Sequence, residues 1–171
     1  MVDNMISISS FIAGLYIPLF HDISLLLHDT TVMFLATSIL LFVVTMIFKQ
    51  KRTVLPIILL SVLLSALFAH GAKMIYQVER PCTTDKIACP DTYSFPSSHA
   101  AVGFSLLLPS IGTPAFWIYF IYSIILAFSR LYLGLHTFFD VAGSFGIALI
   151  GYTIAKYIIV RMELVAHEIR I

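Results

Sequence analysis

The stretch Tyr93–Leu108, YSFPSSHAAVGFSLLL, changes within a few residues from a polar loop to an apolar helix. A proline, two serines and a histidine, Pro96 to His99, occupy the point of change. Ionisable groups are costly at membrane depth, so a titratable ring at the head of an apolar helix indicates a functional site. The composition of the chain and the ionisable residues elsewhere in it indicate what kind of site this is.

The composition indicates an integral membrane protein. Of the 171 residues, 60% are hydrophobic and 11% are charged, whereas a soluble domain has about 45–50% apolar and about 25% charged residues. The net charge of +1 excludes a basic surface for nucleic acid. The length predicts a single domain over residues 1–171.

Apolar runs predict an all-α bundle, because a spanning helix needs about 20 apolar residues. Residues 5–28 have apolar side chains at helical spacing, but Pro18, His21 and Asp22 interrupt them, which favours an interfacial helix and leaves a sixth span open. Five transmembrane helices are predicted: Thr30–Phe48, Thr53–Ala72, Ser97–Ile111, Pro114–Ser129 and Thr137–Val160.

Short basic loops predict the orientation. Lys49, Lys51 and Arg52 follow the first predicted span, and such loops face the cytoplasm. Counting crossings in the plasma membrane then places the loop Glu79–Ser94 outside and the C-terminus inside. This loop contains Cys82 and Cys89, for which an oxidising compartment permits a disulfide, although two free thiols remain the alternative.

Ionisable residues recur at the predicted external ends of four helices, where they form one polar cluster. Its three cations would repel one another unless an anion lies among them, and phosphate fits guanidinium and ammonium groups best. Ser97 and Ser98 add hydroxyls at a helix N-terminus, which also favours an anion. The ionisable residues of the cluster are Lys73, Arg80, His99, Arg130, His136 and Asp140.

His136 and Asp140 stand four residues apart and therefore share a helix face. A carboxylate bonded to one ring nitrogen leaves the other nitrogen free as a nucleophile. His99, on another helix, is then the candidate general acid.

Plainer interpretations exist for each residue alone. Arg130 and Lys73 can snorkel to the interface, and His99 with His136 can ligate haem or a metal, although three neighbouring cations disfavour a metal cation. Ionisable residues away from the cluster are interpreted as structural or interfacial: His21, His28, His70 and Lys156.

Three segments carry a family resemblance: KMIYQVERP (Lys73–Pro81), PSSH (Pro96–His99) and SRLYLGLHTFFD (Ser129–Asp140). They resemble the three signature motifs of the type-2 phosphatidic acid phosphatase superfamily, which includes acid phosphatases and vanadium haloperoxidases of similar fold. The first and third match at every defining position. Ser98 stands where the family usually has glycine.

The resemblance implies a lipid phosphatase that needs no cofactor or metal. It implies that His136 is the nucleophile that forms a phosphohistidine, that Asp140 orients it, and that His99 protonates the leaving group. It assigns phosphate binding to the remaining polar residues of the motifs: Lys73, Arg80, Ser97, Ser98 and Arg130.

The expected partners are a lipid phosphate and the surrounding membrane lipids. A polyprenyl diphosphate, such as undecaprenyl or dolichyl diphosphate, is preferred by analogy with small prokaryotic carrier-lipid phosphatases. Phosphatidic acid or phosphatidylglycerol phosphate is the alternative, and a non-catalytic lipid binder or transporter is the second. Small residues such as Gly103 and Gly143 either make room for a lipid chain or pack helices.

Overall fold

The computed structural model describes residues 2–48 and 53–168, and it describes the side chains of residues 8–48 and 53–165. These residues form seven α-helices and no strand, which confirms the predicted all-α class. The basic residues 49, 51 and 52, which predict the orientation, lie outside the described part. In chain order the helices are α1 (Val2–Gly14), α2 (Pro18–Leu26), α3 (Thr30–Phe48), α4 (Val54–Tyr76), α5 (Ser98–Ser110), α6 (Phe116–Tyr132) and α7 (Phe138–Glu168).

Three of these helices, α3, α4 and α7, are long and apolar enough to cross a membrane. Their outer faces expose large apolar side chains such as Phe42 and Leu63, as a lipid-facing surface requires. The chain is therefore a membrane protein. The total of five crossings stays a prediction, because α5 has 13 residues and α6 has 17, whereas a span needs about 20.

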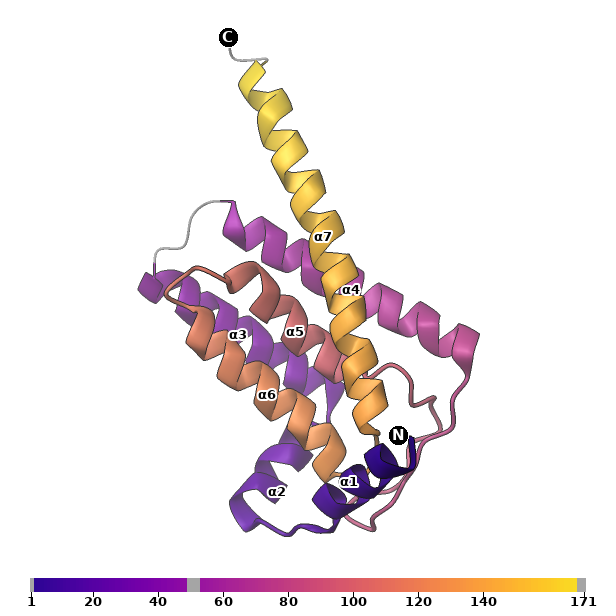
Figure 1. The fold of residues 1–171 in the computed structure, drawn as a ribbon. Helices are drawn as coiled ribbons and strands as arrows, with labels where there is room; N and C mark the ends of the chain where they lie inside the picture. The colour runs from indigo at the N-terminus through magenta and orange to yellow at the C-terminus, as the bar shows by residue number, and fades with distance from the viewer. Residues whose placement is uncertain (1, 49–52, 169–171) are drawn as a thin grey trace.

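The short helix α5 lies inside the bundle, packed between α4, α6 and α7 (Figure 1). Gly103 allows α5 to approach α6, since a Cβ there would lie 3.1 Å from Cα of Ser123. Gly143 of α7 makes room for the ring of Phe95, which would lie 2.3 Å from an added Cβ. Of the two interpretations of these glycines, the structure supports helix and loop packing.

The N-terminal segment departs from the prediction of a single interfacial helix. It forms α1 and α2, which are bent by 106°. Pro18 begins α2, and proline fits the first turn of a helix but cannot continue a preceding one. The pair packs against α6 and α7, and its location in the interface stays a prediction.

The loop between α4 and α5 holds this N-terminal pair in place through Lys86. A disulfide joins Cys82 and Cys89 on either side of it, with the Cα atoms 5.7 Å apart. The Lys86 ammonium donates to the carbonyls of Ala13 at 2.7 Å, of Leu15, and of Tyr132 at 3.1 Å. It also lies 3.5 Å from the centre of the Tyr132 ring. One cation therefore satisfies carbonyls at the α1–α2 break and at the end of α6.

The polar ends of the helices meet at one end of the molecule. The end of α6 and the start of α7 lie beside α1 in the lower part of Figure 1, the start of α5 lies above them, and the end of α4 lies at the right, where the loop between α4 and α5 leads back to the others. The end of α3, the start of α4 and the end of α7 lie at the opposite end.

Replacing Lys86 with methionine tests this anchor. The Lys86→Met variant keeps the apolar stem but leaves three carbonyls without their donor. We expect its Tm in detergent to fall by roughly 3–8 °C, since hydrogen bonds to charged groups contribute about 1.5–3 kcal/mol. The matched control is Lys156→Met, at an exposed position on α7, which should melt like the parent. Equal melting of the two variants would show that the anchor adds no stability.

Candidate active site

The site is built where four helix ends and one loop converge. Lys73 lies in the last turn of α4 and Arg130 in that of α6. His99 lies in the first turn of α5 and Asp140 in that of α7. Arg80 comes from the loop between α4 and α5. These residues come from separate helices and one loop, and they lie at the converging ends where the sequence predicts a polar cluster.

His136 lies between α6 and α7, buried with 4% of its surface exposed. Its Nδ1 is 3.5 Å from Oδ2 of Asp140 and 3.3 Å from Oγ of Ser94. Asp140 Oδ2 accepts hydrogen bonds from the Ser94 hydroxyl at 2.6 Å and from the Thr137 amide at 2.7 Å. The carboxylate is thus fixed on two donors while it faces the imidazole.

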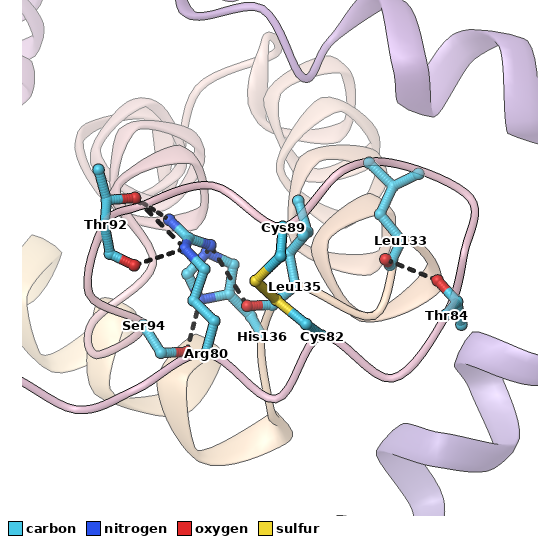
Figure 2. Close-up of a disulfide and its surroundings, with 9 residues drawn as sticks. All are labelled: Arg80, Cys82, Thr84, Cys89, Thr92, Ser94, Leu133, Leu135 and His136. Carbon is cyan, nitrogen blue, oxygen red and sulfur yellow. Dashed lines mark hydrogen bonds between the residues drawn. A yellow bond between two sulfur atoms is a disulfide. The ribbon is translucent and has the colours of Figure 1, made fainter.

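Arg80 contacts the opposite nitrogen of the same ring. Its Nη1 is 3.0 Å from Nε2 of His136 and donates to the Leu135 carbonyl at 3.3 Å (Figure 2). Its Nε and Nη2 each donate at 2.8 Å to Thr92, to the carbonyl and to the hydroxyl respectively. A guanidinium can only donate, so Nε2 accepts and carries a lone pair. The ring proton is therefore on Nδ1, toward Asp140.

The surroundings keep His136 uncharged at neutral pH. Burial, opposed by the hydrogen bond to Asp140 and assisted by the nearby charge of Arg80, lowers the pKa of His136 to about 4. A neutral ring with its lone pair on Nε2 is the protonation state that a nucleophilic histidine needs.

Lys73 positions the loop that carries Ser94. Its ammonium donates to the carbonyls of Tyr93 at 2.6 Å and of Ser94 at 3.0 Å. The cation at the end of α4 is thereby connected, through the backbone of Ser94, to the hydroxyl that bonds Asp140.

His99 and Arg130 form the second half of the site, around His28. The Nε2 of His99 is 3.2 Å from the His28 carbonyl, and the two imidazole planes are parallel within 3° with centroids 6.4 Å apart. Arg130 is 1% exposed. It contacts Nδ1 of His28 and the carbonyl of Ser24, each at 3.4 Å, and the hydroxyl of Ser129 at 3.1 Å.

Backbone hydrogen bonds connect the two halves. The Leu135 amide donates to the Arg130 carbonyl at 3.3 Å, and the Ser97 amide donates to the Asp140 carbonyl at 3.3 Å. Ser97 is buried and caps α5, with its hydroxyl accepting from the Ala100 amide at 3.5 Å. Ser98 is the first residue of α5 and is partly exposed.

The disulfide loop also braces the turn that precedes His136. The Thr83 amide donates to the Gly134 carbonyl at 3.2 Å, and the Thr84 hydroxyl donates to the Leu133 carbonyl at 3.0 Å (Figure 2). These contacts fix the turn at the end of α6 beside Arg80, which is two residues before Cys82. The loop that carries Arg80 and the turn that precedes His136 are therefore bonded to each other, which fixes the distance between the guanidinium and the imidazole.

Several residues of this site are not predicted from the sequence. The prediction for His28 is an interfacial residue, whereas the structure places it between His99 and Arg130. No role is predicted for Thr92, or for Ser94, which bonds a carboxylate 46 positions away. The sequence signal for Ser94 is weak: a hydroxyl three residues before the Ser97 cap.

Metal ligation was the other interpretation of the two histidines. Within the described part of the chain, no group of three or more His, Cys, Asp or Glu side chains is arranged to hold a metal ion.

An all-helical membrane fold that gathers three cations at one set of helix ends suits the binding of a phosphate group. The sequence profile of the PAP2 superfamily matches residues 54–163, more than half of the chain, so the protein belongs to this superfamily. Membership supports a lipid phosphatase. No protein with a curated description matches the chain significantly.

The fold is similar to that of a solved bacterial protein. The transmembrane PAP2-type phosphatidylglycerolphosphate phosphatase from Bacillus subtilis superposes with a TM-score of 0.67 at 18% sequence identity. The superposition covers 89% of this chain and 82% of the other. At this identity the similarity concerns the fold.

Removing the Ser94 hydroxyl tests its place in the site. In Ser94→Ala, Asp140 loses its 2.6 Å donor, and we expect kcat for a lipid phosphate to fall roughly tenfold, as for loss of a hydrogen bond to a charged group. Ser105→Ala is the matched control, because its buried hydroxyl donates to the Val102 carbonyl of the same helix, α5. Unchanged kcat in Ser94→Ala would remove Ser94 from the positioning of Asp140.

Proposed function

We propose that the protein removes the terminal phosphate of a lipid diphosphate, such as a polyprenyl diphosphate carrier, through a phosphohistidine on His136. The observation that carries the proposal is the 3.0 Å contact between Nη1 of Arg80 and Nε2 of His136, with Asp140 on the other side of the ring. This contact places a cationic donor directly in front of the Nε2 lone pair. When a phosphate accepts the Arg80 hydrogen bonds in the proposed complex, its phosphorus takes the place of the guanidinium N–H and the lone pair is free to attack it.

In the first step, Nε2 of His136 attacks the terminal phosphorus. The new P–N bond forms as the P–O bond to the lipid monophosphate breaks. His99, which carries a proton on both ring nitrogens in the proposed substrate complex, gives the Nδ1 proton to the leaving oxygen. Asp140 stabilises the positive ring that results. The cations Lys73, Arg80 and Arg130 hold the phosphate oxygens, assisted by Ser97 and Ser98 at the start of α5.

In the second step, water attacks the phosphorus of the phosphohistidine. The P–N bond breaks, the electron pair returns to Nε2 of His136, and His99 takes a proton from the water. The products are inorganic phosphate and a lipid monophosphate, and the enzyme returns to its starting protonation state.

The substrate reaches this site from the membrane in the proposed arrangement. The polar cluster lies at the opposite end of the molecule from the end of α3 and the start of α4, which flank the basic residues 49, 51 and 52. If those residues face the cytoplasm, the site faces the exterior and the C-terminus the cytoplasm. A head group then enters from the outer leaflet while its tail stays in the lipid.

Phosphatidylglycerol phosphate is the second candidate substrate. It is favoured by the fold similarity to the Bacillus subtilis phosphatidylglycerolphosphate phosphatase. The proposed chemistry is the same for this monoester, with the leaving group an alcohol oxygen in place of a phosphate oxygen.

A substrate panel tests the function. Purified protein in detergent is given a polyprenyl diphosphate, phosphatidylglycerol phosphate and phosphatidic acid, and released phosphate is measured. We expect the highest kcat/KM with the diphosphate and a loss of at least about a thousandfold in His136→Ala, since the nucleophile is removed. Phosphate release that survives in His136→Ala would overturn the phosphohistidine, and binding without release from the parent would indicate a lipid binder.

A chelator tests the proposal that the cations of the site take the place of a metal. Lys73, Arg80 and Arg130 supply the positive charge that a bound metal would otherwise bring. We expect phosphate release in excess EDTA to equal that in untreated enzyme. Loss of activity that added Mg²⁺ or Zn²⁺ restores would refute metal independence.

A further inference from the structure

We propose that His28, in the connection between α2 and α3, is a positioning residue that holds the acid His99 and the phosphate-binding Arg130 in one arrangement. The inference rests on the proposed function and adds to it a contribution from the N-terminal helices. Ser24 and His28 lie outside residues 54–163, where the superfamily profile matches. Neither belongs to the three motifs.

The carbonyl of His28 fixes the orientation of His99. A carbonyl oxygen only accepts, so Nε2 of His99, 3.2 Å away, carries the hydrogen of that bond. Nδ1 of His99 is then the nitrogen that exchanges a proton with the substrate oxygen. The backbone at the end of α2 thus selects which nitrogen of the acid is used.

The ring of His28 fixes Arg130. The guanidinium lies 3.4 Å from Nδ1 of His28, which must accept because Arg130 cannot. The other acceptors of Arg130 are the Ser24 carbonyl and the Ser129 hydroxyl. Since Arg130 is 1% exposed, loss of one of these three acceptors leaves an N–H of a buried cation without a protein partner.

His28 has to remain neutral to accept this bond. It faces Arg130 of α6, His99 of α5 and Arg80 of the loop, with Asp29 beside it in the chain. Burial lowers the pKa of His28, Arg130 and Arg80 lower it further, and Asp29 opposes them. The cations that surround the ring therefore keep it in the accepting form.

The N-terminal pair is held firmly enough to act in this way. Lys86 bonds the carbonyls at the α1–α2 break, and the Tyr132 hydroxyl accepts from the Ile17 amide at 3.1 Å. Both contacts tie the start of α2 to the end of α6, the helix that carries Arg130. These contacts therefore fix the position of His28, which follows α2, relative to Arg130, which lies on α6.

Two substitutions of His28 distinguish the role of its Nδ1 acceptor from the role of its ring as a space-filling group. His28→Asn keeps an acceptor near the position of Nδ1 but has no ring, and His28→Phe keeps a ring but has no acceptor. His21→Phe is the matched control, because His21 lies on α2 with its ring against those of Tyr16 and Tyr132. For each purified variant we measure kcat and KM with the lipid diphosphate, and the Kd of inorganic phosphate.

We expect His28→Phe to lower kcat/KM and to raise the Kd of inorganic phosphate, each roughly tenfold, as for loss of a hydrogen bond to a charged group. His28→Asn should recover most of both values, and His21→Phe should match the parent. Recovery by Phe and not by Asn would overturn the proposal, since it would show that the ring only fills space. Equal values in all variants would overturn it as well.

The two readouts distinguish this proposal from the function on which it rests. If the parent releases no phosphate from any lipid, the proposed function fails, and the Kd of inorganic phosphate still decides the role of His28. If the parent is active and His28→Phe equals it in both readouts, the positioning role alone fails.

Discussion

The contact between Arg80 and His136 is the constraint on which the rest of the site depends. A guanidinium 3.0 Å from an imidazole nitrogen is tolerated only if that imidazole is neutral and accepts the bond. Burial ensures neutrality, and Asp140 and Ser94 hold the proton on the opposite nitrogen. One arrangement of charges therefore fixes the tautomer, the protonation state and the direction of the lone pair.

Two connections between helices supply this arrangement: the loop between α4 and α5, and the turn between α6 and α7 that carries His136. The loop between α4 and α5 carries Arg80 and Ser94, and its disulfide segment bonds the turn before His136. The same loop, through Lys86, holds the break between α1 and α2. A loop of this kind, attached to both the N-terminal pair and the end of α6, lets separate parts of the chain share one site.

Much of this architecture could be predicted from the sequence, and the limits have physical causes. The apolar run over Thr30–Phe48 gives the bounds of α3, because lipid exposure demands an uninterrupted apolar segment. The gathering of Lys73, Arg80, His99, Arg130, His136 and Asp140 followed from the cost of ionisable groups at membrane depth. The roles of Ser94 and His28 could not be predicted, since their partners are 46 and 102 positions away and no local pattern records such contacts.

The charges of the site leave a positive excess that a bound anion can balance. Lys73, Arg80 and Arg130 give three positive charges and Asp140 gives one negative, so with His136 and His28 neutral these groups sum to 3 − 1 = +2, without the proton that His99 carries in the proposed first step. A terminal phosphate group is an anion of comparable size of charge, since a phosphate monoester carries about −1.5 to −2 at neutral pH. The carbonyl acceptors around Lys73, Arg80 and Arg130 stabilise the cations without cancelling their charge. The site is thereby kept attractive to a dianion, which a second carboxylate beside any of these cations would prevent.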